Sequence, residues 1–327
     1  MNAGQFMPSD EVVAGIKADL LRYETERAKA QFAVRWRVPL FLGIYLLLIL
    51  VAALVFNRFS DVNEQWFSPP HVFLYVIGFV VSFFIYGWAM KPATNLQQAF
   101  RAKALPTIFS FINGVTYSQG RTPGSFDRLP RETLDTFNRQ TFDDVITGRY
   151  EDFPFELYEA TLSHKAGKTS SQTFKGIIVA FETITPFPGL LAATRRSGQI
   201  TKFFRGIFGG KLEELTSGVA EIDEAYEFRT DNVEAARPLV TGRLAQALKW
   251  LTETWPEQPA RVALNGSDGF LLIPLSKNFF ELPGISVVLD YKTHVEPMVA
   301  DMAALLATAS LVRKIGVADE PAEAAQP

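Results

Sequence analysis

The sequence predicts an α+β protein: an N-terminal two-helix transmembrane hairpin followed by a soluble antiparallel-sheet domain with two packed helices. Two observations lead to this class. Val38–Phe56 and Val72–Met90 are apolar runs without a charged side chain. After Lys91, more than two hundred residues (of 327) alternate between short apolar stretches, turn residues and amphipathic segments. The first observation predicts the hairpin and the second predicts the soluble domain.

Each apolar run is long enough to cross a bilayer. About nineteen residues at ~1.5 Å per residue give ~28 Å, close to the hydrocarbon thickness. The alternative is a buried hairpin in a soluble protein, but core helices rarely run this long without a charge. The residues before Val38 carry acids as well as bases, and no small-residue cleavage pattern follows Phe56. We therefore expect an anchor that is retained rather than a secretory signal.

Basic residues near the span ends predict the orientation, because cytoplasmic flanks keep positive charge. Five lie in the twenty residues before Val38, only Arg58 lies between the spans, and Lys91, Arg101 and Lys103 follow the second span. This bias predicts a protein with two spans, both termini cytoplasmic and the short loop outside.

The spans themselves contain no charged residue, whereas transporters usually place ionisable groups at membrane depth. Gly78 and Ser82 form a small-xxx-small pattern that lets helices approach closely. The pattern serves either packing of the two spans against each other or dimerisation.

We expect five regions along the chain. Residues 1–37 form a cytosolic N-terminal helix that begins near Ser9. Residues 38–90 form the hairpin, with spans 38–56 and 72–90. Residues 91–116 form a juxtamembrane helix with Pro92 in its first turn, for which a solvated linker is the alternative. Residues 117–316 form the cytosolic α+β domain, and residues 317–327 form a disordered tail rich in Ala, Glu and Pro.

Alternating and continuous apolar runs predict the strands of the soluble domain. Phe153–Leu162 alternates, Lys165–Lys168 supplies a turn, and Gln172–Phe181 reads as a more fully buried returning strand. Further strand candidates are Leu190–Thr194, Ala225–Arg229, Arg261–Leu264 and Gly269–Leu275. Between the last two, Asn265–Gly269 is rich in residues that tolerate positive φ and predicts a hairpin turn.

Two helices are expected to pack on this sheet. Asn232–Trp250 and Val295–Ile315 carry apolar residues at three- and four-residue spacing. Strands and helices in this order favour an antiparallel α+β domain over a βαβ repeat.

Several short motifs in order resemble a bacterial family of two-span membrane proteins with a cytosolic C-terminal domain, catalogued as a domain of unknown function. The motifs are Gly148–Phe155, Phe174–Val179, Phe228–Asp231 leading into Ala235–Leu244, and Asn265–Gly269. The resemblance covers Phe100 to about Ile315. It implies the anchor-plus-domain architecture and a location in the bacterial inner membrane, and it transfers no catalytic residue.

Composition excludes several classes of function. A net charge of −3 and a pI of about 5.8 argue against nucleic acid as a partner. The absence of cysteine excludes disulfides and thiolate chemistry, and the three histidines (His71, His164 and His294) lack metal-ligand spacing. We therefore predict no catalytic, metal or cofactor residue.

Clustered carboxylates keep one alternative open. Asp143-Asp144, Glu151-Asp152 and Glu156/Glu159 could bind a divalent cation or perform acid–base chemistry. Strand-exposed and helix-end charges explain these residues as well.

A basic, aromatic segment is the main candidate for a contact surface. No acid lies between Thr183 and Leu212, whereas Glu213–Glu234 carries eight acids. Such a segment could rest on anionic lipid. In the alternative interpretation, its aromatic residues tuck into the core and its bases pair with the acidic stretch. The candidate contact residues are Arg195, Arg196, Lys202, Phe203, Phe204, Arg205, Phe208 and Lys211.

These observations favour a membrane-anchored, non-enzymatic protein whose cytosolic domain binds a protein partner or the inner-leaflet surface. Its expected partners are the lipid bilayer and a protein at the cytoplasmic membrane face. Two other hypotheses are a membrane-tethered enzyme, metal-assisted through Asp143, Asp144 or Glu151, and a small subunit of a transport or envelope-assembly complex that uses the Gly78/Ser82 face.

Overall fold

The computed structural model describes residues 9–59, 69–167, 169–196, 212–256, 259–281 and 283–315. The chain divides into two compact units. The helical unit consists of Asp10–Thr107 and Leu282–His294, and the sheet unit contains Ile108–Glu281 and the chain from Val295 onward. The class is α+β, as expected.

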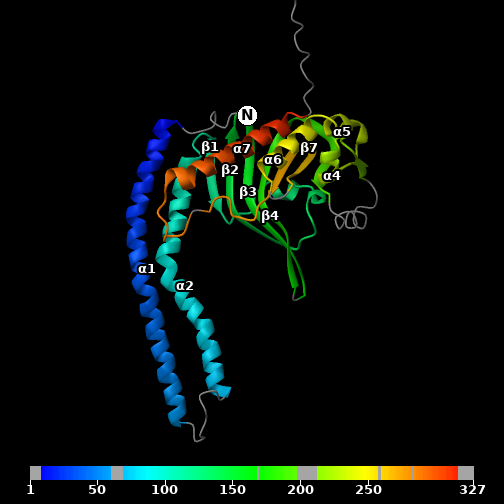
Figure 1. Ribbon diagram of the computed structural model, residues 1–327. Helices are drawn as coiled ribbons and strands as arrows, with labels where there is room; N and C mark the ends of the chain where they lie inside the picture. Colours follow the sequence, from blue (N-terminus) through cyan, green and yellow to red (C-terminus); the bar gives the residue numbers. More distant parts are fainter. Residues whose placement is uncertain are drawn as a thin grey trace, which may run out of the picture. The chain divides into compact units, whose positions relative to one another are not determined.

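Two long helices make up most of the helical unit. Helix α1 (Asp10–Phe59) has 50 residues and helix α2 (Pro69–Ile108) has 40, and they run side by side (Figure 1). The rings of Tyr23 and Phe100 lie 4.0 Å apart, and those of Phe41 and Trp88 lie 4.8 Å apart. Since residues early in α1 meet residues late in α2, the two helices are antiparallel.

The helices are longer than the sequence suggested. Pro39 lies inside α1, and Pro92 and Pro106 lie inside α2, so neither flanking segment is a separate helix. The expected start at Pro92 is therefore wrong. A proline costs a helix one hydrogen bond and a steric clash, about 3 kcal/mol, which packing on both sides can offset. Ala89 and Ala93, on either side of Pro92, are both buried.

An irregular segment packs on these helices within the helical unit. We call residues 283–294 the strap; its last residues enter the single π-helical turn η4 (Tyr291–Val295). Gln97 Nε2 donates to the Pro283 carbonyl at 3.3 Å, and Arg27 Nη1 donates to the Ile285 carbonyl at 2.5 Å. The strap is thus tied to both helices by side chains that reach its backbone.

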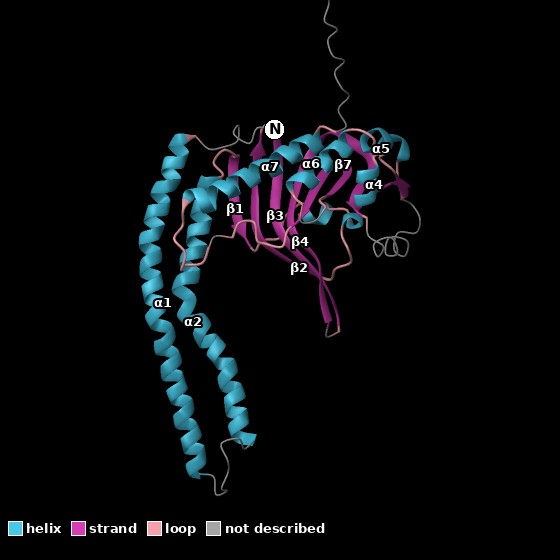
Figure 2. Ribbon diagram, viewed as in Figure 1, coloured by secondary structure: helices cyan, strands magenta, loops and turns pink. Residues whose placement is uncertain are grey.

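Within the part of the chain that the structure describes, the sheet unit is built on seven strands whose pairings are all antiparallel (Figure 2). The order is β1-β2-β3-β4-β6-β5, and β7 also pairs with β4. Strand β4 is central because it has 27 residues and holds β3, β6 and β7. The strand bounds are β1 Asn113–Gln119, β2 Arg139–Tyr150, β3 Phe153–Ala166, β4 Thr169–Arg195, β5 Glu213–Leu215, β6 Tyr226–Thr230 and β7 Arg261–Pro274.

Both faces of the sheet are covered. The chain around the short helices η2 (Phe126–Arg128) and η3 (Arg131–Thr133) contributes Phe126, Leu129 and Leu134 to a core with residues of β2, β3, β4 and β7. Helix α7 (Glu296–Arg313) contacts β4 and β7. Buried residues on successive positions of β4, such as Ile177, Ile178 and Val179, follow from this double covering.

The helical region after β6 differs from the single helix expected over Asn232–Trp250. A short helix α4 (Ala220–Ala225) precedes β6, and α5 (Val233–Val240) and α6 (Arg243–Thr254) follow it. The Asn232 side chain caps α5 by accepting from the Ala235 N–H. Gly242 separates α5 from α6, with a backbone that is not helical (φ −120°, ψ −115°). The helix over Val295–Ile315 is confirmed as α7.

The hairpin predicted at Asn265–Gly269 is wrong, because β7 is one strand from Arg261 to Pro274. Both of its halves pair with β4: Leu264 lies opposite Leu191 and Gly269 opposite Phe181. Gly266 does adopt a positive φ of 58°, but where the register between β4 and β7 shifts. The turn-like residues of Asn265–Gly269 thus form an irregularity within β7, which lets this strand pair with β4 on both sides of the register shift.

Among the described residues, three helices are long and apolar enough to cross a membrane. The most apolar window is 6% buried in α1 and 11% buried in α2. In the third helix, Tyr291–Arg313, that window is 67% buried. Burial thus sets α1 and α2 apart from the third helix.

Candidate functional site

A β-bulge brings three carboxylates together in the sheet unit. Phe142 pairs with Ala160 and Val145 pairs with Tyr158, so Asp143 and Asp144 of β2 both lie opposite Glu159 of β3. The four flanking side chains belong to the core on one face, and Glu159 points to the other face by strand alternation. Ligand atoms of the three carboxylates lie within 4.8 Å of one another. We call Asp143, Asp144 and Glu159 the bulge cluster.

Strand β1 supplies a donor to each of the two aspartates. The Tyr117 hydroxyl on β1 donates to Asp144, and Gln119 Nε2 donates to Asp143 at 3.1 Å. Asp144 is fully buried. The cluster is therefore fixed from the β1 side of the sheet.

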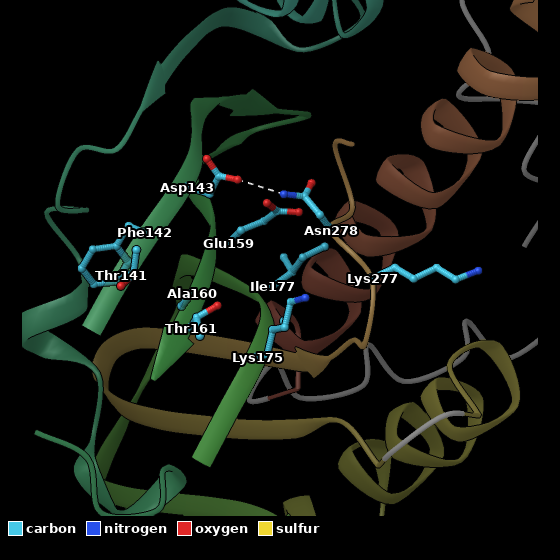
Figure 3. Close-up of a pocket in the computed structure, with 11 residues that line it drawn as sticks. Thr141, Phe142, Asp143, Glu159, Ala160, Thr161, Lys175, Ile177, Lys277 and Asn278 are labelled. Carbon is cyan, nitrogen blue, oxygen red and sulfur yellow. Dashed lines mark hydrogen bonds between the residues drawn. The ribbon is translucent and has the colours of Figure 1, made fainter. Parts of the chain in front are cut away.

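The segment after β7 supplies the remaining donors. We call residues 276–281 the connector, because the chain passes through it from the sheet unit to the strap. Asn278 Nδ2 donates to Asp143 Oδ2 at 2.9 Å (Figure 3). The backbone N–H groups of Phe279 and Phe280 both donate to Glu159 Oε1, the second at 3.3 Å. The cluster thus holds the connector by its backbone and by one side chain.

A cavity of about 310 Å³ lies beside the cluster, lined by residues of β2, β3, β4 and the connector. Lys175 and Lys277 contribute basic groups to its lining, and Lys175 Nζ donates to the Ser276 carbonyl at 2.9 Å. In Figure 3, Asp143 and Glu159 lie beside the Asn278 amide, while Lys277 extends away from them. The cavity is therefore acidic at the bulge and has basic groups elsewhere on its wall.

Burial sets the protonation of Glu159. Removal from water, together with the charges of Asp144 and Asp143, raises the pKa of this carboxyl to about 7. The N–H groups of Phe279 and Phe280 act in the opposite direction, but the net shift is upward. Near neutral pH the cluster therefore holds a proton for part of the time.

Three carboxylate oxygens this close together could also hold a metal ion. Here, however, protein donors reach both oxygens of Asp143, and Asp144 and Glu159 each accept from the chain as well. We therefore do not assign these residues as metal ligands.

The enzyme hypothesis names Asp143, Asp144 or Glu151, and the structure places Glu151 apart from the two aspartates. Glu151 lies in the β2–β3 turn with a φ of 50°, where it accepts from Ser310 Oγ at 3.1 Å. The third carboxylate beside Asp143 and Asp144 is that of Glu159. A signal was present in the sequence, since Glu159 is a charged residue within the mostly apolar run Leu157–Leu162, but the bulge that pairs it with two aspartates was not visible there.

The basic segment is only partly within the described residues. Arg195 and Arg196 are exposed at the end of β4. Arg196 forms an ion pair with Glu214 of β5 at 3.0 Å and donates through Nε to the Tyr226 carbonyl. The other predicted contact residues lie outside the described residues: Lys202, Phe203, Phe204, Arg205, Phe208 and Lys211.

The two small residues of the second span have different surroundings. The Tyr45 hydroxyl donates to the Gly78 carbonyl at 2.9 Å, and a Cβ at position 78 would meet Ile49 Cδ1 at 2.6 Å. Ser82 Oγ donates to the Phe79 carbonyl of its own helix at 2.6 Å. Gly78 is therefore a position of close approach between α1 and α2.

Comparison with known proteins gives one distant likeness. No protein-family model matches the sequence, and no curated protein does either. Among solved structures, the chain is similar to the mycobacterial trehalose monomycolate transport factor A, TtfA, with 12% identity and a TM-score of 0.36. The similarity covers 62% of this chain and 86% of that one. At these values it carries no inference about function.

Proposed function

We propose that this protein is anchored in a membrane by α1 and α2 and that its sheet unit acts as a binding module rather than an enzyme. The observation that carries the proposal is the exposure of apolar side chains along both helices. Phe73, Phe79 and Phe84 of α2 are 68%, 67% and 74% exposed. A soluble protein rarely leaves a continuous apolar surface of this kind in water, and lipid would cover it.

The orientation follows from the flanking charges. Arg35 and Arg37 precede the first apolar run, and Lys91 follows the second. These residues support a bacterial inner-membrane protein with two spans and both termini cytoplasmic. We leave the third long helix, α7, out of this proposed count; the burial of 67% of its apolar window supports that choice.

The lack of cysteine gives a direct test of the orientation. A single cysteine in place of Asn63, between the spans, should react with an impermeant thiol reagent in intact cells. A cysteine in place of Ser170, in the sheet unit, should react only after the cells are opened. Reaction of Ser170→Cys but not Asn63→Cys in intact cells would reverse the topology. Extraction of the protein by carbonate without detergent would reject the anchor itself.

We place the binding activity of the sheet unit at the segment 195–211, where it contacts anionic lipid of the inner leaflet or an acidic partner. Arg195 and Arg196 enter this segment from β4 as exposed cations, which supports the proposal. A basic residue near an anionic surface contributes about 1 kcal/mol. Partial pairing of Arg196 with Glu214 lowers that contribution for this residue.

The lipid contact can be measured in the full chain. A single Gln199→Cys variant would carry an environment-sensitive fluorophore in nanodiscs of zwitterionic lipid or of lipid with added phosphatidylserine. We expect phosphatidylserine to shift the emission. High salt should abolish this shift, and so should replacement by Gln of the five bases of the segment, Arg195, Arg196, Lys202, Arg205 and Lys211. The same replacement at five bases elsewhere, Arg121, Arg139, Arg149, Lys249 and Lys292, is the matched control. If the emission does not change with phosphatidylserine, anionic lipid is not the ligand. An acidic protein partner would then be sought by crosslinking from the same cysteine.

A further inference from the structure

The connector is held to the strands of the sheet by acidic side chains that repel one another. Asp143 accepts from the side chain of Asn278, and Glu159 accepts from the backbone of Phe279 and Phe280. Phe280 is fully buried, and its ring lies against the Phe109 ring at 5.8 Å. The connector is thus packed on the sheet, which we call the seated state, and its polar attachments include two of the three bulge carboxylates and the Lys175 ammonium at the Ser276 carbonyl.

Like charges in a buried site cannot all remain ionised at low cost. Asp144 and Glu159 are buried, and the three ligand atoms lie within 4.8 Å of one another. A proton on one of them removes the repulsion. A protonated Glu159 still has a carbonyl oxygen that accepts from the two N–H groups of the connector.

From this geometry we propose that the bulge cluster holds the connector against strands β2 and β3 by sharing one proton, and that loss of this proton releases the connector from these strands. The released state is one in which Glu159 is ionised and hydrated. The chain continues from the connector into the strap, so the cluster would set how firmly this crossing point is held as pH changes.

The charged groups around the bulge cluster are consistent with a raised pKa of Glu159. Among the described residues that face Glu159, the acids are Asp143 and Asp144 of β2, and the bases that line the adjoining cavity are Lys175 of β4 and Lys277 of the connector itself. Tyr117 of β1 acts through Asp144. Lys175 already donates to Ser276, and the balance of burial and repulsion raises the pKa of Glu159.

The sign of the pH effect follows from linkage. The seated state binds the proton more tightly than a hydrated carboxyl does, so the seated state gains population as pH falls and loses it as pH rises toward and through neutrality. Between about pH 5.5 and about pH 8 the change in the seating equilibrium is tenfold or more.

Hydrogen–deuterium exchange of the full chain in lipid nanodiscs tests the proposal. Protection of peptides covering 276–281, corrected for the intrinsic pH dependence of exchange, should fall about tenfold from about pH 5.5 to about pH 8. Glu159→Gln keeps a neutral acceptor of the same shape, so its protection should be high and equal at both pH values. Glu213→Gln, an exposed acid on β5, should behave as the wild type.

Three results would overturn the proposal: wild-type protection that does not change with pH, a pH response that persists in Glu159→Gln, or a response that appears only with added divalent cation and vanishes with a chelator. If Glu159→Gln does not fold, Asp144→Asn serves instead. Removing that charge should reduce the pH response, and a full response in that variant would contradict the shared proton.

Discussion

Tyr45 and Gly78 lie in contact across the helical hairpin, and the Tyr45 hydroxyl donates to the Gly78 carbonyl at 2.9 Å. A side chain at position 78 would run into Ile49, since even a Cβ there would lie 2.6 Å from Ile49 Cδ1. The contact explains why a glycine is accommodated inside an apolar helix, where it lowers helix propensity by about 1 kcal/mol relative to alanine. Close approach between the two helices offsets that cost.

Gly78→Val should therefore loosen the hairpin. Phe41 and Trp88 are neighbours on the two helices, so cysteines at these positions can report their proximity by disulfide formation in the otherwise cysteine-free chain. We expect crosslinking to fall several-fold with Gly78→Val. Gly87→Val is the control, because a Cβ at position 87 meets nothing within 4 Å. Equal loss in both variants would mean that helix propensity, not contact, is responsible.

Arg27 should be a main anchor of the strap. Its side chain is only 9% exposed and bonds to Glu24 at 2.7 Å and to the Ile285 carbonyl at 2.5 Å. Glu24 in turn accepts from the Leu289 N–H at 2.9 Å. Hydrogen bonds of a charged group contribute about 1.5–3 kcal/mol, so Arg27→Met should raise amide exchange in the strap by at least tenfold.

The matched control is Lys29→Met on the same helix, since Lys29 is 69% exposed and pairs only with Glu26 among the described contacts. Exposed pairs of this kind contribute about 0–1 kcal/mol. If Lys29→Met loosened the strap as much as Arg27→Met, net charge on α1 and not the buried contact would be the cause.

Glu159 should impose a pH dependence on the free energy of unfolding. Its folded pKa of about 7 lies above that of a hydrated glutamate, so the folded state binds more protons than the unfolded state between these values. Stability from this group is therefore present at low pH and is lost as pH rises through about 7. The slope is up to about 1.4 kcal/mol per pH unit.

This slope can be isolated by difference. Denaturant unfolding of the wild type and of Glu159→Gln in the same detergent, between about pH 5 and about pH 8, should give two curves that converge at low pH and separate toward high pH, with the variant more stable. Parallel curves would show that the proton affinity of Glu159 does not change on unfolding.

Gly266 should be required for its backbone conformation and not for space. Its φ is 58°, and a Cβ there meets nothing within 4 Å. We expect Gly266→Ala to lower the free energy of unfolding by about 1 kcal/mol, and Gly266→Asn to lower it less, since asparagine tolerates this region. Gly124→Ala is a control with equal space and no positive φ. Equal costs at both sites would show that the positive φ of Gly266 is not the cause, because the reduced entropy of the unfolded chain on replacing glycine by alanine is stabilising.

The sequence predicted those elements whose hydrophobic periodicity or turn residues lie within the element itself. These are the β3–β4 hairpin, the strand at 226–230, the C-terminal helix and the two apolar helices. The errors lie where tertiary contacts override a local preference. Pro92 does not begin a helix because both sides of it are packed, and Asn265–Gly269 does not turn because β4 is long enough to pair with β7 on either side of it.

The bulge cluster could not be predicted in the same way. In the sequence, Asp143 and Asp144 are adjacent acids and Glu159 belongs to the pair Glu156/Glu159. Nothing local indicates that two residues of one strand will lie opposite one residue of the next strand. That register arises from strand pairing across the core, where Phe142 and Val145 must both keep their places against Ala160 and Tyr158.

Two helices of membrane-spanning length and an α+β unit follow from chain length, apolar content and periodicity, which are local properties that no partner segment has to supply. Tertiary packing sets which apolar helices stay exposed, which acids meet and which segment those acids hold. Those outcomes depend on which segments, distant in the sequence, share a core, and the balance of burial against repulsion at Glu159 exists only once they do.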